Sequence, residues 1–507
     1  MGMPALQRLM SLQRDRQRQI RAQNGSIVSV NKRKASLYKQ NGDGDSQAGK
    51  IRRCSIPELP EDIWGHIHSL MPLRDAARAA CLSRAFLRSW RCHPNLTFNK
   101  DVLSSKAHAR GGNFGHTIDR ILRNHSGIGV KILNFELHGI PYQNLDSWLQ
   151  VALTPGIEEL TLTLCRSKIK FDFPCSLLSD GTRNSIRSLE LGFCAFRPTA
   201  ELGPLRSLTS MCLHYVRITG DELECLLSKS LALKQLDLSD CMEIICLKIP
   251  CVLQQFSCLR VHGCWRLREI ESKAPNLSTL DFSGKVKLSL GETLRMKNLS
   301  MLCSNVICFA RAELPSIMPN LERLHIRSDD EVVSTPMLQA KFFYLKHLTI
   351  CMRSGTFSPS YDYFSLVSFL DASPSLETLI LDVSQEHMEH ESVFGQSSHL
   401  RHMAEHHHCC LKSVKITGFN SAKSLVELIC QVLKNAVSLE YITLDTLYGW
   451  RCSDENFERC FPMGKSILRE ASRALAAIRA HIEDRVPATA KLTVLEPCSR
   501  CHAGGGW

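Results

Sequence analysis

One apolar pattern returns along most of the chain, and it limits the possible folds more than any other feature. It consists of an apolar residue, two other residues, a second apolar residue, one other residue and a third apolar residue, as in LKQLDL at 233–238. Most neighbouring copies begin 21 to 29 residues apart. The copies begin at Val130, Ile157, Ile186, Leu208, Leu233, Phe256, Leu277, Leu299, Leu321, Leu345, Leu376, Leu411 and Leu439. A period of this length is typical of architectures in which similar units stack side by side.

The spacing predicts a short strand in each copy, because alternate residues of a strand point to opposite faces. In the copy at 233–238, Leu236 and Leu238 face a core and Asp237 faces outward. One such strand cannot bury its apolar side alone, so the copies are expected to stack into a parallel sheet. The pattern resembles the leucine-rich repeat. We therefore expect an α/β solenoid with a parallel β-sheet on its concave face and helices or loops on its convex face.

The exposed face of that sheet is the expected binding surface, and we call its outward-facing side chains the concave strip. Their mixed charge does not identify a ligand. The candidate substrate-binding residues of the concave strip are Glu190, Asp237, Arg260, His262, Asp281, Arg323, His325 and Arg327.

Three copies carry a cysteine three residues after the last strand position. These are Cys194, Cys241 and Cys264. The position suits a small buried side chain beneath the turn. The chain contains 23 cysteines, an odd number scattered along its length, and we expect most of them to be reduced and structural.

A separate helical packet precedes the repeats, in LPEDIWGHIHSLMPLRDAARAACLSRAFLRSW at 59–90. Pro60 suits a first helical position, and Ile63, Ile67 and Leu70 recur at the spacing of one helix face. A break follows at Met71-Pro72, then a second helix from about residue 75 to 86 and a third segment near Trp90. About 40 residues form too small a core for independent stability. The repeats or another protein must therefore cover the rest of its apolar surface.

The packet resembles the F-box, through its Leu-Pro start, the Met-Pro-Leu break, the Ala/Cys-rich second helix with Ser-Arg, and the final Trp. This resemblance implies docking on a Skp-type adaptor of a cullin-RING ubiquitin ligase, with the remaining chain capturing an unknown protein substrate. A small molecule bridging to the target is also possible within this scheme. The implied adaptor-binding residues are Leu59, Pro60, Ile63, Ile67, Leu70, Cys81, Leu82 and Trp90.

An F-box followed by leucine-rich repeats resembles a large plant protein class, and 411–444 resembles its C-terminal FBD region. The expected organisation is a disordered basic tail at 1–54, the F-box at 55–95, a helical linker or cap at 96–129 and leucine-rich repeats at 130–404. The repeats are followed by FBD-like last repeats at 405–450, a C-terminal helical cap at 451–490 and a flexible tail at 491–507. The terminal helix is expected to cover the open end of the stack.

The basic character of the chain belongs to its N-terminal tail. Residues 1–55 contain 12 Lys and Arg against 3 Asp, a net charge of +9 out of +12 for the whole chain. Two basic clusters across a polar spacer resemble a bipartite nuclear-import signal, so we expect the protein in the nucleus, the cytoplasm or both. Nucleic-acid binding is not expected, because the tail lacks interleaved aromatic residues. The candidate import residues are Lys32, Arg33, Lys34, Lys50, Arg52 and Arg53.

No stretch reaches the roughly 18 apolar residues of a membrane-spanning helix. Cys498, Cys501 and His502 spell a haem-attachment motif and His402 to Cys410 form a ligand-rich cluster, but neither has the supporting pattern of a haem or zinc site. No catalytic motif is present, and we expect no enzyme activity, no cofactor and no metal. Two alternatives stay open: a repeat scaffold or nuclear binding protein that assembles no ligase, and a metal or haem enzyme.

Overall fold

The computed structural model describes residues 60–103, 114–126, 129–137, 143–165, 171–178, 180–199, 201–331, 334–352, 361–384, 390–395, 399–403, 406–447 and 464–497. Residues 1–58 form one unit and residues 59–507 a second. The following account concerns the second unit. Leu59 and the six candidate import residues lie outside the described residues.

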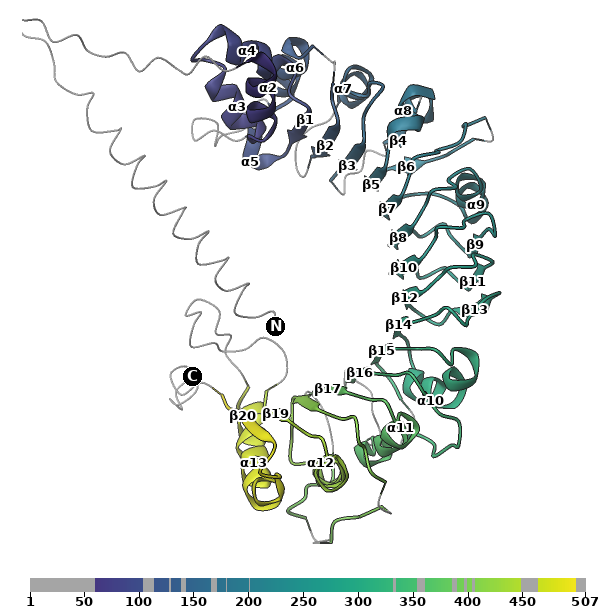
Figure 1. Cartoon of the computed structure of the whole chain (residues 1–507), viewed down its shortest axis with the longest axis vertical. Coiled ribbons are helices and arrows are strands. Elements are labelled where there is room, and N and C mark those ends of the chain that lie inside the picture. The colour runs from purple at the N-terminus through teal and green to yellow at the C-terminus, as the bar shows by residue number, and fades with distance from the viewer. Residues whose placement is uncertain are drawn as a thin grey trace, which may run out of the picture. The chain divides into compact units, whose positions relative to one another are not determined.

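A sheet of 15 parallel strands runs through this unit. The strands follow one another along the inner side of a curve (Figure 1). Equivalent positions are in register, so that Leu236 lies opposite Leu259 and Leu259 opposite Leu280. The strands, in sheet order, are β1 (Asn95–Phe98), β2 (Ile132–Glu136), β3 (Glu159–Thr163), β5 (Ser188–Gly192), β7 (Ser210–His214), β8 (Gln235–Ser239), β10 (Cys258–His262), β12 (Thr279–Ser283), β14 (Asn298–Leu302), β15 (Arg323–Ser328), β16 (His347–Met352), β17 (Thr378–Val383), β18 (Ser413–Thr417), β19 (Tyr441–Asp445) and β20 (Lys491–Leu495).

A second layer of helices and short strands covers the opposite face of the sheet. Figure 1 shows these elements on the outer side of the curve. The helices are α7 (Leu145–Ala152), α8 (Asp180–Ser185), α9 (Gly220–Ser228), α10 (Val306–Ile317), α11 (Val367–Ala372), α12 (Lys423–Asn435) and α13 (Lys465–His481), with 3₁₀ turns η1 (Cys175–Leu177), η2 (Tyr363–Leu366) and η3 (Glu483–Arg485). The strands are β4 (Asp172–Phe173) paired with β6 (Ala195–Phe196), and the three-stranded sheet β13 (Lys287–Leu290), β11 (Glu269–Ser272) and β9 (Cys246–Ile249).

The core lies between these two layers. Strand residues alternate between buried and half-exposed positions, and Leu236, Leu259 and Leu280 are fully buried. Burial of this kind stabilises by about 2 kcal/mol for each leucine. The α/β solenoid expected from the sequence is therefore confirmed.

The helical packet at the N-terminal end of this unit contains three short helices, α2 (Glu61–Ser69), α3 (Leu73–Ala79) and α4 (Arg84–Arg91). Two further helices, α5 (Lys100–Leu103) and α6 (Phe114–Asn124), follow β1. Pro60 immediately precedes α2, and Pro72 precedes α3 and separates the two helices as the sequence predicted. The Ser83 hydroxyl accepts a hydrogen bond from the Phe86 amide and thereby caps α4.

Four expectations need correction. The copy placed at Leu299 begins at Met296. Leu299 lies opposite Leu280, which is the second apolar position of the copy that begins at Leu277, so Leu299 is also a second apolar position. The region 96–129 is not wholly helical, since β1 pairs with β2. The segment 491–507 is not a flexible tail throughout, since β20 pairs with β19. Finally, α13 packs against α12 and leads into β20, so it does not close the end of the sheet.

Candidate functional site

The packet is built around one aromatic side chain. Phe86 of α4 is buried, and its ring centroid lies 4.8 Å from that of Trp64 and 4.9 Å from that of His68, both on α2. Leu73 and Ala76 of α3 are also buried. Few large side chains are buried within the packet, which agrees with its small size.

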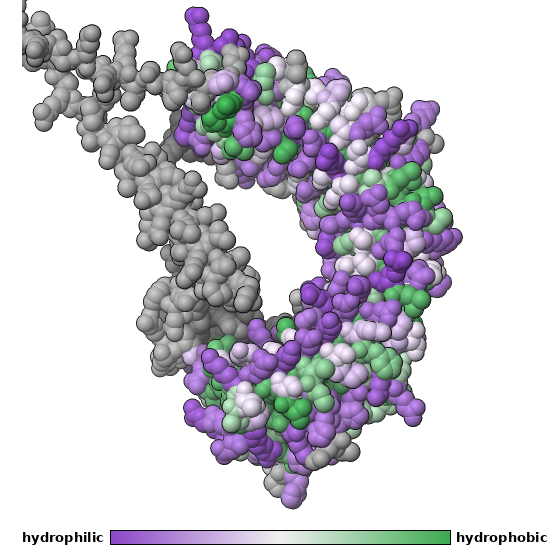
Figure 2. All heavy atoms as spheres, in the orientation of Figure 1, coloured by the Kyte–Doolittle hydropathy of each residue, from purple (hydrophilic) through white to green (hydrophobic). Residues whose placement is uncertain are grey.

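Several apolar side chains of the packet remain in contact with solvent. Leu70 and Leu82 are each 73% exposed and Ile63 is 43% exposed. Pro60 and Cys81 are exposed as well. Hydrophobic side chains accordingly appear at the surface over α2 to α4 in Figure 2. Exposed large apolar groups gathered on one small module are typical of a protein interaction surface.

A cavity of about 460 Å³ adjoins this surface, between α3, α4 and α6. Cys81 and Trp90 line it, whereas Ile67 is half-buried in α2. The indole Nε1 of Trp90 is buried and has no hydrogen-bond partner among the described residues. Arginines surround the cavity, and no Asp or Glu of the described part of the chain lines it, so its charge suits an acidic partner. The arginines are Arg74, Arg78, Arg91 and Arg120.

Sequence analysis missed the contribution of α6 to this cavity. Arg120, Ile121 and Asn124 lie on it, beyond the F-box pattern. The available signal was the amphipathic run FGHTIDRILRN, in which Ile118 and Leu122 are buried and the arginines are on the other side.

The packet is joined to the repeats by hydrogen bonds around His93. Its Nδ1 lies 3.1 Å from the Asn95 amide nitrogen and 2.9 Å from the Asn95 carbonyl oxygen, and its Nε2 contacts the Met71 carbonyl at 3.1 Å. His125, after α6, contacts the His93 carbonyl through Nε2 at 2.9 Å. Leu73 shares the continuous core with Leu96 of β1. The packet therefore also covers the first strand of the sheet.

All eight predicted residues of the concave strip lie on strands of the main sheet and face away from its core. Neighbouring strands place opposite charges side by side. Arg260 Nη1 lies 3.2 Å from both carboxylate oxygens of Asp237, and Gln235 donates to the same carboxylate at 2.8 Å. The strip is therefore partly organised before any ligand binds.

The strip contains a second polar cluster. His262 Nε2 lies 3.2 Å from Asp281 Oδ2, and this hydrogen bond raises the pKa of His262 above its ordinary value. Burial lowers the pKa of His325, and the positive charge of Arg327 lowers it further. His325 also contacts the Cys351 thiol at 3.5 Å, and that thiol donates to Asp382 at 3.3 Å. Sequence analysis missed Cys351 and Asp382 because it sampled only the most regular repeats.

The predicted ligand-rich segments hold no assembled metal site in the part of the chain that is described. No three His, Cys, Asp or Glu side chains lie close enough there to hold a metal ion. The motif at Cys498 to His502 falls outside the described residues. Among the described helices, none has the length and apolar character needed to span a membrane.

These features define a class of protein: a leucine-rich-repeat solenoid with a partly uncovered F-box packet at its N-terminal end. The F-box domain family matches residues 56–97. The family described as At1g61320/AtMIF1, LRR domain, matches residues 121–499, and the chain belongs to this family.

The chain is also similar to proteins of Arabidopsis thaliana whose names include an F-box together with an FBD or leucine-rich repeats. The putative FBD-associated F-box protein At1g61330 is 22% identical over 79% of this chain and 92% of its own length. The FBD-associated F-box protein At1g61320 is 21% identical over 64% of this chain and 75% of its own. The F-box/LRR-repeat protein At3g03360 is 25% identical over 64% of this chain and 70% of its own length. The resemblance stated from the sequence is thus confirmed.

Proposed function

We propose that this chain is a non-catalytic substrate-recognition subunit of an SCF-type cullin-RING ubiquitin ligase. The F-box packet docks on a Skp-type adaptor, and the concave strip binds the target protein. The observation that carries this proposal is the solvent exposure of Ile63, Leu70 and Leu82 on a module that matches the F-box family. Covering these side chains with a partner removes apolar area from water and favours association.

In this scheme the ubiquitin-transfer chemistry takes place on partner proteins. The chain contributes proximity, because holding a target near the transferring enzyme replaces a bimolecular encounter by an intramolecular one. The strip suits a polar target surface that presents both charges, since it pairs Asp237 with Arg260 and Asp281 with His262. Arg327 lies on the same strip, beside these pairs.

The docking claim is tested by co-purification with a purified Skp-type adaptor. Leu70→Glu/Leu82→Glu places two charges on the exposed apolar surface and is expected to reduce adaptor recovery at least about tenfold. Leu231→Glu is the matched control, because Leu231 is 53% exposed but lies among the repeats. Equal recovery of wild type and the double variant would contradict docking through this surface.

The scaffold alternative has one observation in its favour. The packet shares its core with β1 through Leu73 and Leu96, so it covers the end of the sheet whether or not an adaptor binds. Leu73→Ala should lower the melting temperature in either case, because Leu73 is buried in the shared core. A pure cap predicts that Leu70→Glu/Leu82→Glu changes no adaptor binding, so adaptor recovery by this double variant separates covering from docking.

We further propose that the two basic clusters of the tail direct nuclear import. The support is their charge and spacing alone. A fluorescent fusion of the full chain with Lys32→Ala/Arg33→Ala/Lys34→Ala is expected to lose nuclear enrichment. Unchanged enrichment would refute this role.

A further inference from the structure

The outer three-stranded sheet ends at an uncovered edge. On its inner side, β13 pairs with β11: the Lys287 amide donates to the Arg268 carbonyl at 2.9 Å, and the Gly291 amide to the Ser272 carbonyl at 2.8 Å. Parallel ladders use alternate residues on each side of a strand. The amide and carbonyl groups of Leu288 and Leu290 therefore face the other way, toward α10. No described residue forms a hydrogen bond with them on that side.

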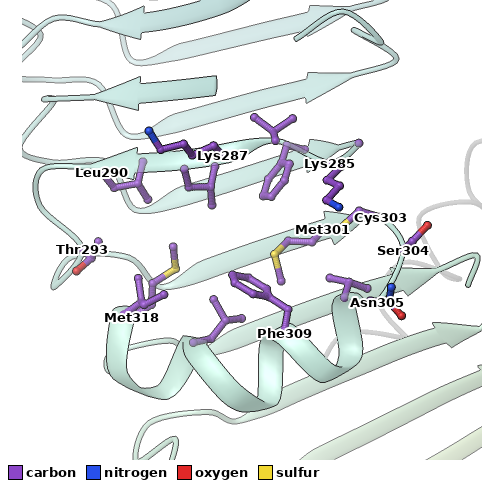
Figure 3. Close-up of a pocket in the computed structure, with 17 residues that line it drawn as sticks. Lys285, Lys287, Leu290, Thr293, Met301, Cys303, Ser304, Asn305, Phe309 and Met318 are labelled. Carbon is purple, nitrogen blue, oxygen red and sulfur yellow. The ribbon is translucent and has the colours of Figure 1, made fainter. Parts of the chain in front are cut away.

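A cavity of about 550 Å³ lies beside this edge, between β13 and α10. Figure 3 shows Phe309 of α10 and Met318, which directly follows this helix, on one side, Met301 at the back, and Leu290 with two lysines on the other side. Phe309 and Ile317 are 37% and 38% exposed. The cavity is thus apolar, open to solvent and bordered by unpaired backbone.

The space matches one additional short strand. Strands lie about 4.8 Å apart, packed layers are about 10 Å thick and each residue adds about 3.3 Å, so four residues occupy on the order of 600 Å³. The neighbouring strand β13 is itself four residues long. An added strand would pair with the free groups of Leu288 and Leu290 and place alternate side chains in the cavity.

The charge at the border of the cavity indicates which kind of segment could bind there as an added strand. Among the described residues, no Asp or Glu lines the cavity, whereas two lysines stand at its border. Lys287 is paired with Glu269 at 2.9 Å, but Lys285 has no ion pair among the described residues. The chain's own N-terminal tail carries +9 in residues 1–55, the same sign as these lysines, so its charge is not complementary to theirs. A purely aliphatic ligand would leave the backbone groups of β13 without partners.

We propose that the edge of β13 binds an extended partner segment of alternating apolar and acidic residues, which becomes the fourth strand of the outer sheet. Its apolar residues enter the cavity beside Phe309 and Met301, and an acidic residue faces Lys285. This site lies on the layer opposite the concave strip and does not depend on the proposed ligase function.

Fluorescence anisotropy of the full chain tests the proposal directly. The probe is an acetylated, fluorophore-labelled Val-Glu-Val-Glu-Val peptide, and Val-Lys-Val-Lys-Val is its charge-reversed control. Leu288→Pro removes the outward-facing amide donor but spares the ladder to β11, because proline is accepted on an edge strand. Leu288→Val keeps that donor and is the matched control. Lys285→Glu is a second variant with no change to the strand.

We expect saturable binding of the acidic peptide to wild type and Leu288→Val, at least about tenfold weaker binding to Leu288→Pro and Lys285→Glu, and weaker binding of the lysine peptide. Hydrogen exchange at Leu288 and Leu290 should slow when the acidic peptide is bound. Absence of saturable binding to wild type, or equal binding to Leu288→Pro and Leu288→Val, would overturn the proposal. Binding of dodecanoate without binding of the peptide would assign the cavity to a small apolar ligand instead.

Discussion

Gly220 marks a close approach between two elements of the outer layer, α9 and β9. It is the first residue of α9, which begins with a capping box formed by Thr219 and Glu222. A Cβ at Gly220 would lie 2.3 Å from the Cys246 carbonyl oxygen at the start of β9. Because that oxygen belongs to the backbone of β9, it cannot avoid the added Cβ by a side-chain rotation.

Gly220→Ala is therefore expected to destabilise the fold by about 2–3 kcal/mol. Gly65→Ala is the control, since Gly65 lies inside α2 and a Cβ there meets no atom within 4 Å. Alanine at that position should stabilise by about 0.5–1 kcal/mol. Thermal or chemical unfolding of both variants measures the difference, and equal effects would refute the steric argument.

Arg401 forms the most extensive ion-pair cluster among the described residues near the C-terminal repeats. Its guanidinium bonds to Asp362 at 2.8 and 2.9 Å and lies 2.6 Å from Glu427, a carboxylate with no exposure to solvent. The guanidinium carbon also lies 4.9 Å from the centre of the Phe364 ring. These carboxylates raise the pKa of Arg401, with Asp362 contributing most.

Arg401→Met is expected to destabilise the fold by about 3 kcal/mol, because it leaves the Glu427 carboxylate buried without its charge partner. Arg401→Met/Glu427→Leu should recover much of this loss, since it removes the buried charge as well. Urea unfolding of wild type, single and double variants completes the test. A double variant less stable than Arg401→Met would contradict this explanation.

At the residue level, the sequence predicted most of the core but misplaced one copy and did not predict an ion-pair cluster between distant segments. Cys194, Cys241 and Cys264 are buried as expected, and burial raises the pKa of the Cys194 thiol to about 12. The copy at Met296 was missed because MKNLSM contains two methionines where other copies carry leucine, and Leu299 then fits the pattern at the wrong position. Arg401 had no sequence signal, since its partners lie 39 and 26 residues away.

At the scale of the strand, the register of the parallel strands determines which charged side chains of the concave strip lie side by side. Parallel pairing places Arg260 between Asp237 and Asp281, and His262 reaches across to Asp281. The His262 hydrogen bond raises the pKa of the imidazole, so the folded state favours its protonated form. Arg327 on β15 opposes this shift without reversing it.

The pair should therefore contribute to stability below the ordinary imidazole pKa of 6.5, and this contribution should disappear as pH rises through the raised value. His262→Gln is expected to lower stability by about 0.5 kcal/mol near pH 6, because the pair is partly exposed, and by almost nothing near pH 9. Melting temperatures of both proteins across this range measure the difference. A larger effect of the substitution at pH 9 than at pH 6 would contradict the assignment.

Elements with the full repeat pattern were predictable, and shorter ones were not. Strand β1 has only Leu96 and Phe98 as buried strand positions, so nothing distinguished it from the helical linker. Strand β13 reads KLSL, too short to show its period. Strand β20 follows a helix that resembled an end cap, which concealed one more repeat. The outer sheet and the cavity beside it could therefore not be predicted from the sequence.

At the scale of the molecule, the two proposed binding tasks belong to separate surfaces. The packet presents exposed apolar groups beside a basic cavity, and the sheet presents a polar face with both charges. The core between Leu73 and Leu96 connects the two structurally. Substitutions in one surface should consequently leave binding at the other unchanged.

Affinity purification from proteasome-inhibited cells tests this division most directly, with wild type compared with Leu70→Glu/Leu82→Glu and with Arg260→Glu/Arg327→Glu. We expect wild type to recover a Skp-type adaptor, a cullin and a target protein. The packet variant should keep the target and lose adaptor and cullin, while the strip variant should do the reverse. Loss of all partners from a variant that remains folded, or recovery of the adaptor by the packet variant at the wild-type level, would contradict the account.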